Sequence, residues 1–259
     1  MAIPFLPRLL LAASVTWLGL AGAGQAAAQV SVAGSELLID RADLRVERLD
    51  LARGGGSGEI GMLTALIDPA GASLGVADRP LSAELPPADR WEVRIDASFF
   101  DEFDRPIRLI RDRAVSLGSY RSDSSAVFWC VAGLCRITPS RQWDPATDTD
   151  LAVQATPRLI ADGAATQGVR NPDRLAARAG IAVLGDGRIL LFATDRGRAS
   201  AMSFNEVRAW LQTGYPVSEA VMLDGGSSAI LSVAFGPFWF ENQGFRADVP
   251  LFLSFSGTL

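Results

Sequence analysis

The sequence predicts an α+β fold, a single strand-rich domain with a mixed sheet and one or two helices. The apolar segments are short, and most of them alternate with polar residues, as strands do. The 259 residues include 25 Gly and 14 Pro, which divide the chain into many turns. Clear helical spacing occurs in one segment, residues 200–214. Short strands, frequent turns and few helices together are typical of this class.

The first 28 residues have the layout of a secretory signal peptide. Arg8 precedes an apolar stretch, and small residues follow as far as Ala28, which favours cleavage before Gln29. An uncleaved anchor is the alternative, but the apolar stretch is shorter than the roughly 20 residues that span a bilayer. We therefore expect a signal peptide over 1–28 and one exported domain over 29–259, periplasmic or secreted, with no membrane span in the mature chain.

The composition excludes several classes of site. The chain has no His, no Lys and only two Cys, and its formal net charge is −5. The chain therefore cannot form a Ser-His-Asp triad, a lysine Schiff base or a P-loop. A zinc site built from His and Cys is nearly excluded. No basic patch indicates a nucleic-acid partner. No cofactor is expected, although an oxygen-rich site is compatible with Ca²⁺ or Mg²⁺.

The first half of the chain reads as strands joined by turns. The expected pieces are edge strands over 29–50, a glycine-rich loop over 53–59, strands over 61–69 and 72–78, a proline-rich connector over 80–89, and a buried strand, turn and second strand over 91–110.

The two cysteines flank a four-residue loop between two strand-like segments. A hairpin places Cys130 and Cys135 opposite each other, close enough to bridge. In an exported protein we expect a structural disulfide. A redox pair is the alternative, but its usual spacing is Cys-x-x-Cys.

The second half contains a strand and turn, a hairpin and the helix. Residues 150–163 read as a strand followed by a turn, and 178–195 as a hairpin around Gly-Asp-Gly. In the helix, Ser203 and Glu206 form a Ser-x-x-Glu capping box, so Glu206 needs no catalytic explanation.

The segment AVMLDGGSSAILSV, residues 220–233, has two interpretations. Asp-Gly between apolar runs is a strong hairpin signal, so DGGSS can be a plain turn. Alternatively, the glycines let the backbone approach an anion closely while Asp224 supplies a reacting carboxylate.

The chain from Trp91 onward resembles the phosphodiester glycosidase family. The matching pieces follow in order: RIDASFFDEFDRPI, AVQATPRLIADG, RAGIAVLGDGRILLFATD, and SFNEVRAWLQTGYPVSEAVMLDGGSS with its Ser-x-x-Glu helix and Leu-Asp-Gly-Gly-x-Ser motif. The resemblance covers about two thirds of the expected mature chain, judged by residue count. It implies cleavage of a sugar-1-phosphate diester, in exported bacterial members often linked to exopolysaccharide.

Three positions depart from the family pattern. Asp96 stands where the family has Asn, Thr156 where Gly precedes the proline, and Ala179 where Thr or Asn is commoner. An added negative charge at Asp96 would either raise the pKa of its own carboxyl group, making it a proton donor, or weaken the binding of an anion. These departures bear on substrate identity and on activity.

The resemblance implies roles for particular residues. Asp224 is the main catalytic carboxylate, with Asp96 or Asp195 as its partner; Asp195 has the alternative of being a turn former. The residues expected to contact phosphate or substrate are Arg178, the Gly225 and Gly226 amides, Ser228, Gln154 and Arg246. A guanidinium fork suits a phosphodiester. Taken individually, each of these residues could also be structural.

We therefore expect an exported hydrolase that cleaves a sugar-1-phosphate diester in cell-envelope or exopolysaccharide metabolism. A non-catalytic envelope protein that binds polysaccharide and retains the fold is the main alternative. A serine hydrolase using Ser228 is a second alternative, but it lacks a base that would work at neutral pH.

Overall fold

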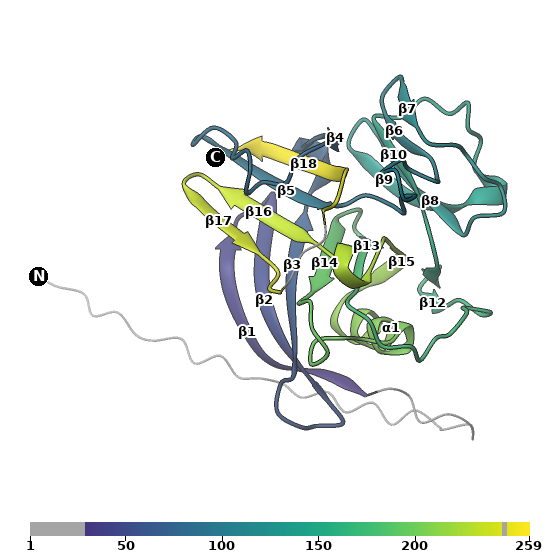
Figure 1. Cartoon of the computed structure of the whole chain (residues 1–259). Coiled ribbons are helices and arrows are strands. Elements are labelled where there is room, and N and C mark those ends of the chain that lie inside the picture. The colour runs from purple at the N-terminus through teal and green to yellow at the C-terminus, as the bar shows by residue number, and fades with distance from the viewer. Residues whose placement is uncertain (1–28, 245–247) are drawn as a thin grey trace, which may run out of the picture.

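The computed structural model describes residues 29–244 and 248–259 (Figure 1). The predicted signal peptide and Arg246 lie outside these ranges. Every strand pairing in the described part is antiparallel, so the expectation of a mixed sheet was wrong. Strands dominate, and the described part contains one α-helix together with three short 3-10 turns. The described part is therefore strand-rich with few helices, as the sequence predicts.

Three antiparallel sheets make up the fold. The large sheet has the strand order β1-β2-β3-β14-β13-β15-β11-β12. Its strands are β1 (Val30–Asp40), β2 (Leu44–Arg53), β3 (Ile60–Ile67), β14 (Ile189–Thr194), β13 (Ala179–Leu184), β15 (Val217–Met222), β11 (Arg158–Ala161) and β12 (Ala164–Ala165).

The other two sheets have five strands each. The C-terminal sheet has the order β17-β16-β5-β18-β4, and the disulfide sheet has the order β7-β6-β10-β8-β9. The bounds are β17 (Phe238–Glu241), β16 (Leu231–Phe235), β5 (Arg90–Asp96), β18 (Phe252–Thr258), β4 (Ser73–Ala77), β7 (Val115–Leu117), β6 (Ile110–Asp112), β10 (Leu151–Ala155), β8 (Ala126–Val131) and β9 (Leu134–Pro139). The 3-10 turns are η1 (Pro69–Gly71), η2 (Ser140–Gln142) and η3 (Gly226–Ser228).

One hydrophobic core joins the three sheets. It includes Leu63 from the large sheet, Val93 and Phe255 from the C-terminal sheet, and Phe128 and Val153 from the disulfide sheet. A second cluster fills the opposite face of the large sheet, under the helix. The large sheet is therefore buried on both faces around β13 and β14, which explains why every residue of those two strands is buried.

The helix α1 (Phe204–Gly214) forms where the sequence predicts it. The Ser203 hydroxyl accepts from the Glu206 N–H at 3.1 Å, and the Glu206 carboxylate accepts from the Ser203 N–H at 2.7 Å. Both halves of the capping box are thus present, as predicted. Trp210 and Leu211 face the large sheet, and the Trp210 and Phe192 rings meet edge to face at 5.2 Å. At 11 residues α1 is far shorter than the roughly 20 needed to span a bilayer, and no helix in the described ranges has the length and hydropathy to do so.

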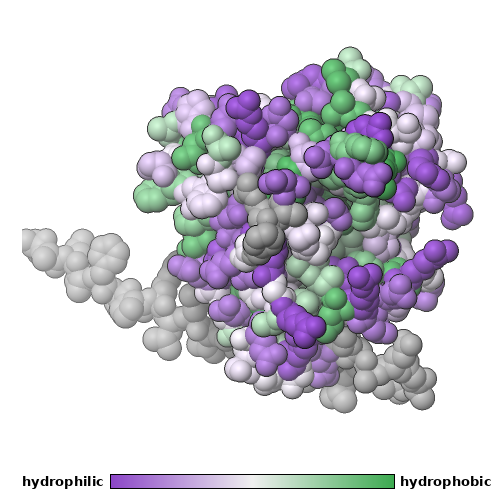
Figure 2. Space-filling model, viewed as in Figure 1, coloured by the Kyte–Doolittle hydropathy of each residue, from purple (hydrophilic) through white to green (hydrophobic). Residues whose placement is uncertain are grey.

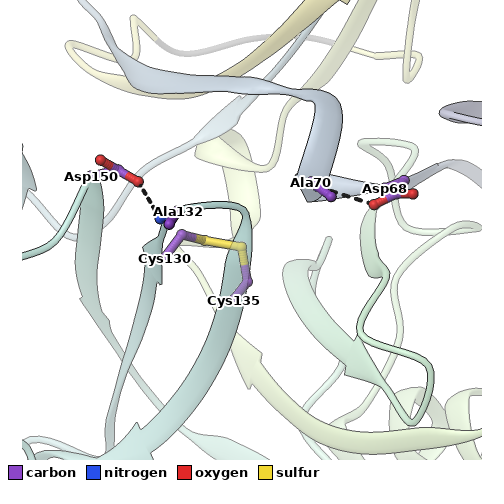
Figure 3. Close-up of a disulfide and its surroundings, with 6 residues drawn as sticks. All are labelled: Asp68, Ala70, Cys130, Ala132, Cys135 and Asp150. Atoms are coloured by element: carbon purple, nitrogen blue, oxygen red, sulfur yellow. Dashed lines mark hydrogen bonds between the residues drawn. A yellow bond between two sulfur atoms is a disulfide. The ribbon is translucent and has the colours of Figure 1, made fainter.

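The predicted disulfide is present at the end of the β8–β9 hairpin (Figure 3). Cys130 and Cys135 are direct cross-strand partners with Cα atoms 4.1 Å apart. The hairpin turn rests on η1, where a Cβ on Gly133 would come within 2.7 Å of the Ala70 Cα. Gly133 also has φ of +76°, so both its conformation and its close contact favour glycine. The disulfide therefore fixes the hairpin that packs on η1.

Removing this disulfide is expected to lower the free energy of unfolding. The disulfide closes a short loop and so reduces the conformational entropy of the unfolded chain. In the chain-entropy treatment this raises the free energy of unfolding by about 2 kcal/mol. Urea denaturation of a Cys130→Ala/Cys135→Ala double variant should show that loss, and dithiothreitol should shift the wild type alone. An unchanged midpoint in the double variant would show that the hairpin needs no covalent bond.

The surface seen in Figure 2 is mostly polar, with hydrophobic groups near the β6–β7 hairpin and near the turn between β16 and β17. Exposed apolar residues of these two hairpins include Val115 and Leu117 on β7 and Phe238 and Trp239 on β17. Both patches lie on hairpins, away from the junction of the sheets.

Candidate active site

The DGGSS segment is a crossover between two sheets. The strands before and after it, β15 and β16, belong to the large sheet and the C-terminal sheet respectively. The hairpin interpretation was therefore wrong. The crossover begins just after β15 at Asp224 and ends just before β16 at Ile230, whose carbonyl accepts from the N–H of Asp96, the last residue of β5. The change of sheet is what brings Asp224 and Asp96 together.

The two glycines of the crossover are required for different reasons. A Cβ on Gly225 would lie 2.9 Å from the Ala177 carbonyl oxygen, and Gly226 has φ of +65°. The Gly226 N–H donates to the same Ala177 oxygen at 2.9 Å, and the Gly225 N–H donates to Asp224 Oδ1 at 2.8 Å. Both amides therefore already have partners within the turn, and this geometry gives no support to their expected role as phosphate donors.

Asp96 is a wholly buried carboxyl group with one unsatisfied oxygen. Its Oδ1 accepts from the Ile230 N–H at 3.1 Å, and its Oδ2 has no hydrogen-bond partner among the described residues. Burial raises the pKa of Asp96 well above its ordinary value, and the charge of Asp224 adds to that rise, while the Ile230 N–H opposes it. Asp96 therefore keeps its proton to higher pH than an ordinary aspartate does.

Asp224 is half-buried at the end of β15. Burial also raises the pKa of Asp224, opposed by the Gly225 N–H and the Ser228 hydroxyl, which favour the charged form. Asp96 is the more deeply buried of the two, so it holds its proton to higher pH. Two neighbouring carboxyls with pKa values pushed apart are the usual arrangement for acid–base work, in which one is neutral while the other is charged.

The raised pKa of Asp96 bears on its departure from the family's Asn. A protonated Asp has the size of Asn, carries no charge, and still accepts the Ile230 N–H. In its neutral form Asp96 therefore reproduces the amide that the family pattern expects, without placing an extra negative charge beside Asp224.

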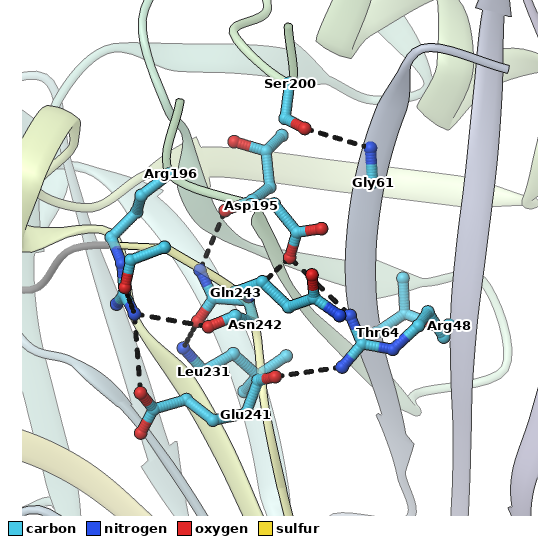
Figure 4. Close-up of polar contacts among 12 residues, drawn as sticks. Arg48, Gly61, Thr64, Asp195, Arg196, Ser200, Leu231, Glu241, Asn242 and Gln243 are labelled. Atoms are coloured by element: carbon cyan, nitrogen blue, oxygen red, sulfur yellow. Dashed lines mark hydrogen bonds and ion pairs between the residues drawn. The ribbon is translucent and has the colours of Figure 1, made fainter. Parts of the chain in front are cut away.

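Asp195 lies in a separate polar network, drawn in Figure 4. Its Oδ1 accepts from the Gln243 N–H at 2.5 Å and lies 3.6 Å from Arg48 NH1. A Cβ on Gly61 would come within 2.0 Å of Asp195 Oδ2, so Gly61 leaves the space that this carboxylate fills. Within the described ranges no contact joins Asp195 to Asp224, and the geometry favours Asp96 as the partner carboxyl.

Arg178 turns toward the start of α1. Its Nε donates to the Met202 carbonyl at 2.7 Å, its NH2 donates to the Arg174 carbonyl, and its guanidinium carbon lies 3.9 Å from the centre of the Phe204 ring. Burial lowers the pKa of Arg178 to about 10, so it stays charged at neutral pH. No ion pair between described residues joins Arg178 to Asp224. The sequence analysis expected Arg178 to contact phosphate or substrate, but its hydrogen bonds instead hold the 174–178 segment in place.

Gln154 is buried on β10 with its amide fully used. Its Oε1 accepts from the Arg121 N–H at 2.9 Å, and its Nε2 donates to the Arg121 carbonyl at 2.7 Å and to Ser140 Oγ at 3.0 Å. Gln154 thus anchors the loop around Arg121 and leaves no spare donor for a substrate.

Two residues that the sequence analysis did not predict support the crossover at the point where it meets β16. Asn242 Nδ2 donates to the carbonyls of Ala229 and Thr194 at 3.1 and 2.8 Å, and its Oδ1 accepts from the Leu231 N–H at 2.9 Å. Arg196 NH1 donates to the same Ala229 carbonyl at 3.1 Å. Figure 4 shows both residues converging where β16 begins. The only local signal was their position just after a strand.

A pocket of about 380 Å³ borders the crossover. Its lining includes Gly226, Ser227, Arg196 and Arg198. Arg198 is exposed and makes no ion pair within the described part of the chain. This pocket places a free guanidinium beside the glycine turn. Nowhere in the described ranges do three or more acidic, Cys or His side chains gather in a group that could hold a metal ion.

Comparisons with known proteins concern the family and the fold. A family profile described as phosphodiester glycosidase matches residues 89–250. A crystal structure of a hypothetical protein from Synechocystis is 16% identical with a TM-score of 0.61, and covers 86% of this chain. This chain spans 64% of that protein.

A second similar structure is the zebrafish N-acetylglucosamine-1-phosphodiester alpha-N-acetylglucosaminidase catalytic domain, described as auto-inhibited by its pro-peptide. It is 14% identical with a TM-score of 0.58, covering 90% of this chain and 89% of that one. At these identities the structures show the fold alone. A search of curated proteins gave no significant match.

Proposed function

We propose, from the premise that this chain belongs to the phosphodiester glycosidase family, that it is an exported hydrolase cleaving a sugar-1-phosphate diester. The observation that carries the proposal is the pairing of Asp224 with the wholly buried Asp96 at the crossover, where burial raises the pKa of both carboxyls. The zebrafish neighbour, whose name specifies a sugar-1-phosphodiester bond, supports the choice of bond. The substrate would be a glycan or glycan-phosphate of the cell envelope.

The reaction adds water across the bond between the anomeric carbon and the phosphate oxygen. That C–O bond breaks, its electron pair leaves with the phosphate monoester, and the oxygen of water bonds to the anomeric carbon. A phosphate monoester has a second pKa of about 6, so its oxygen leaves with little help from an acid. One carboxylate is therefore sufficient to carry the proton transfer from water or to attack the carbon.

Asp224 is the group placed to act on substrate, because it is partly accessible and charged more readily than Asp96. Ser228 contributes a hydroxyl that stabilises the carboxylate of Asp224. Asp96 acts through Asp224 as a positioning residue: it is wholly buried, and its neutral form leaves Asp224 as the one negative charge of the pair.

Arg198 is the side chain best placed to bind the phosphate. It lines the 380 Å³ pocket together with Ser227. Arg178 supports the pocket wall through its bond to the Arg174 carbonyl. A guanidinium in this position neutralises the charge that develops on the departing phosphate oxygen.

Hydrolysis of a panel of sugar-1-phosphate diesters tests the proposal. The panel should vary the sugar and its anomeric configuration, and released sugar should be followed by chromatography with and without a chelator. Turnover of at least one diester is expected. Failure to cleave any member, while the protein still binds the glycan part, would replace the enzyme with a binding protein.

A non-catalytic, polysaccharide-binding protein is the second candidate, and two observations favour it. Asp96 is inaccessible, and both glycine amides are used within the turn. Such a protein would bind the diester and its hydrolysis-resistant phosphonate analogue equally well and release neither sugar.

A further inference from the structure

A second pocket, of about 670 Å³, lies between the disulfide sheet and the large sheet. We call it the arginine pocket. The disulfide-sheet wall contributes Arg141 on η2 and residues 122–125, and the large-sheet wall contributes residues 156–158 and Arg170. Its lining residues adjoin β8 and β9 of the disulfide sheet and β12 of the large sheet, which Figure 1 labels.

The pocket is cationic although the chain as a whole is acidic. Three arginines and one acid line it, whereas the whole chain has a formal charge of −5. Arg158 is neutralised by Glu219, with Nε and NH2 each within 2.8 Å of a carboxylate oxygen. Arg141 and Arg170 are exposed and form no ion pair within the described part of the chain. Two free guanidiniums therefore stand on opposite walls.

Hydroxyl groups complete a polar lining. Ser124 Oγ is buried and has no hydrogen-bond partner among the described residues, and Ser122, Thr156 and Gln167 also line the pocket. An unsatisfied buried hydroxyl costs free energy unless a bound group or water supplies its partner. The combination of free guanidiniums, hydroxyls and the Phe204 ring suits a sugar that carries an anion.

The floor of the arginine pocket is hydrogen-bonded to β15, the strand that precedes Asp224. Thr156 N–H donates to the Met222 carbonyl at 3.1 Å, and Met222 N–H donates to the Pro157 carbonyl at 3.0 Å. Met222 is two residues before Asp224. The arginine pocket and Asp224 are therefore both attached to β15.

We propose that the arginine pocket binds an anionic sugar unit, bearing a carboxylate or a phosphate, of the glycan that presents the scissile bond. The part of this inference that concerns the scissile bond depends on the proposed function; the binding of an anionic glycan does not. According to this inference, the substrate is an acidic polysaccharide rather than a neutral one.

Calorimetric titration with defined tetrasaccharides tests this inference. The anionic probes are tetragalacturonate for carboxylate and 6-phosphorylated maltotetraose for phosphate; their neutral counterparts are methyl-esterified tetragalacturonate and maltotetraose. At least one anionic probe should bind roughly tenfold more tightly than its neutral counterpart, because charge-assisted hydrogen bonds are worth about twice neutral ones. The probe that does so identifies the anion.

Arg141→Gln and Arg170→Gln should each weaken that binding roughly tenfold, and the double variant roughly a hundredfold, since the two side chains lie on separate walls. Arg136→Gln is the matched control, because Arg136 is an exposed arginine of the same sheet outside the pocket lining. Equal binding of neutral and anionic probes, or an equal loss with Arg136→Gln, would overturn the inference.

Hydrolysis of a small diester separates this inference from the proposed function. Arg136→Gln should leave its kcat/KM unchanged, because Arg136 lies outside both the arginine pocket and the crossover. If no diester is cleaved but anionic tetrasaccharides bind through both arginines, the inference stands and the proposed function fails.

Discussion

Replacing Asp224 with Asn is expected to lower kcat/KM for a sugar-1-phosphate diester by about 10²–10⁴-fold, the range that a positioned acid–base group contributes. The amide cannot accept a proton from water or attack the anomeric carbon. Its carbonyl can still accept from the Gly225 N–H, as Asp224 Oδ1 does at 2.8 Å, so the turn should persist. The measurement is initial-rate kinetics on the best diester of the panel.

Asp148→Asn supplies the matched control for this substitution. Asp148 is exposed and forms no hydrogen bond or ion pair with the described residues, so the variant removes the same charge outside the crossover. It should keep wild-type kinetics. Equal rates for wild type and Asp224→Asn would remove Asp224 from the chemistry, and a fallen thermal midpoint would assign the loss to folding instead.

Replacing Asp96 with Asn is expected to make stability less dependent on pH. Burial raises the folded-state pKa of Asp96 well above the value of about 3.9 in an unfolded chain. Between these two values the folded state binds more protons than the unfolded state, so the free energy of unfolding falls as pH rises. The slope for one such group is about 1.4 kcal/mol per pH unit, up to the folded pKa.

Asn carries no titrating proton. Above about pH 4 the free energy of unfolding of the variant should therefore rise steadily relative to that of the wild type. At pH 3.5 the two should be nearly equal, since both then place a neutral group beside the Ile230 N–H. Urea unfolding at pH 3.5, 5.5 and 7.5 measures the difference, and Asp148→Asn again controls for net charge. A difference that stays constant across this range would show that Asp96 is ionised in the folded protein.

Local patterns were sufficient for the elements whose stabilising contacts are local. The capping box at Ser203 and Glu206 and the cross-strand pair Cys130 and Cys135 depend on residues a few positions apart, and both were predicted correctly. The family was predicted for a similar reason, because its motifs are short and occur in a fixed order.

The site was harder to predict because its contacts connect different sheets. The pattern around Asp224 is that of a hairpin, and nothing within those residues reveals that β15 and β16 belong to separate sheets. Which sheet each strand joins depends on how the apolar faces of the sheets pack together in the folded chain. Asn242 and Arg196 reach the crossover through contacts over 13 and 33 positions, which no periodicity encodes. Gln154 and Arg178 were expected at the substrate from the family resemblance, but their hydrogen-bond partners are groups of the protein itself.

The pH dependence of kcat/KM in wild type and Asp96→Asn tests most directly whether the two carboxyls work as a pair. The wild type should give a bell-shaped profile. Activity rises as Asp224 loses its proton above the ordinary range of an aspartate, and it falls at higher pH as Asp96 ionises and repels the anionic substrate. Asp96→Asn should keep the acid limb and lose the alkaline one. Superimposable profiles for the two proteins would contradict the pairing.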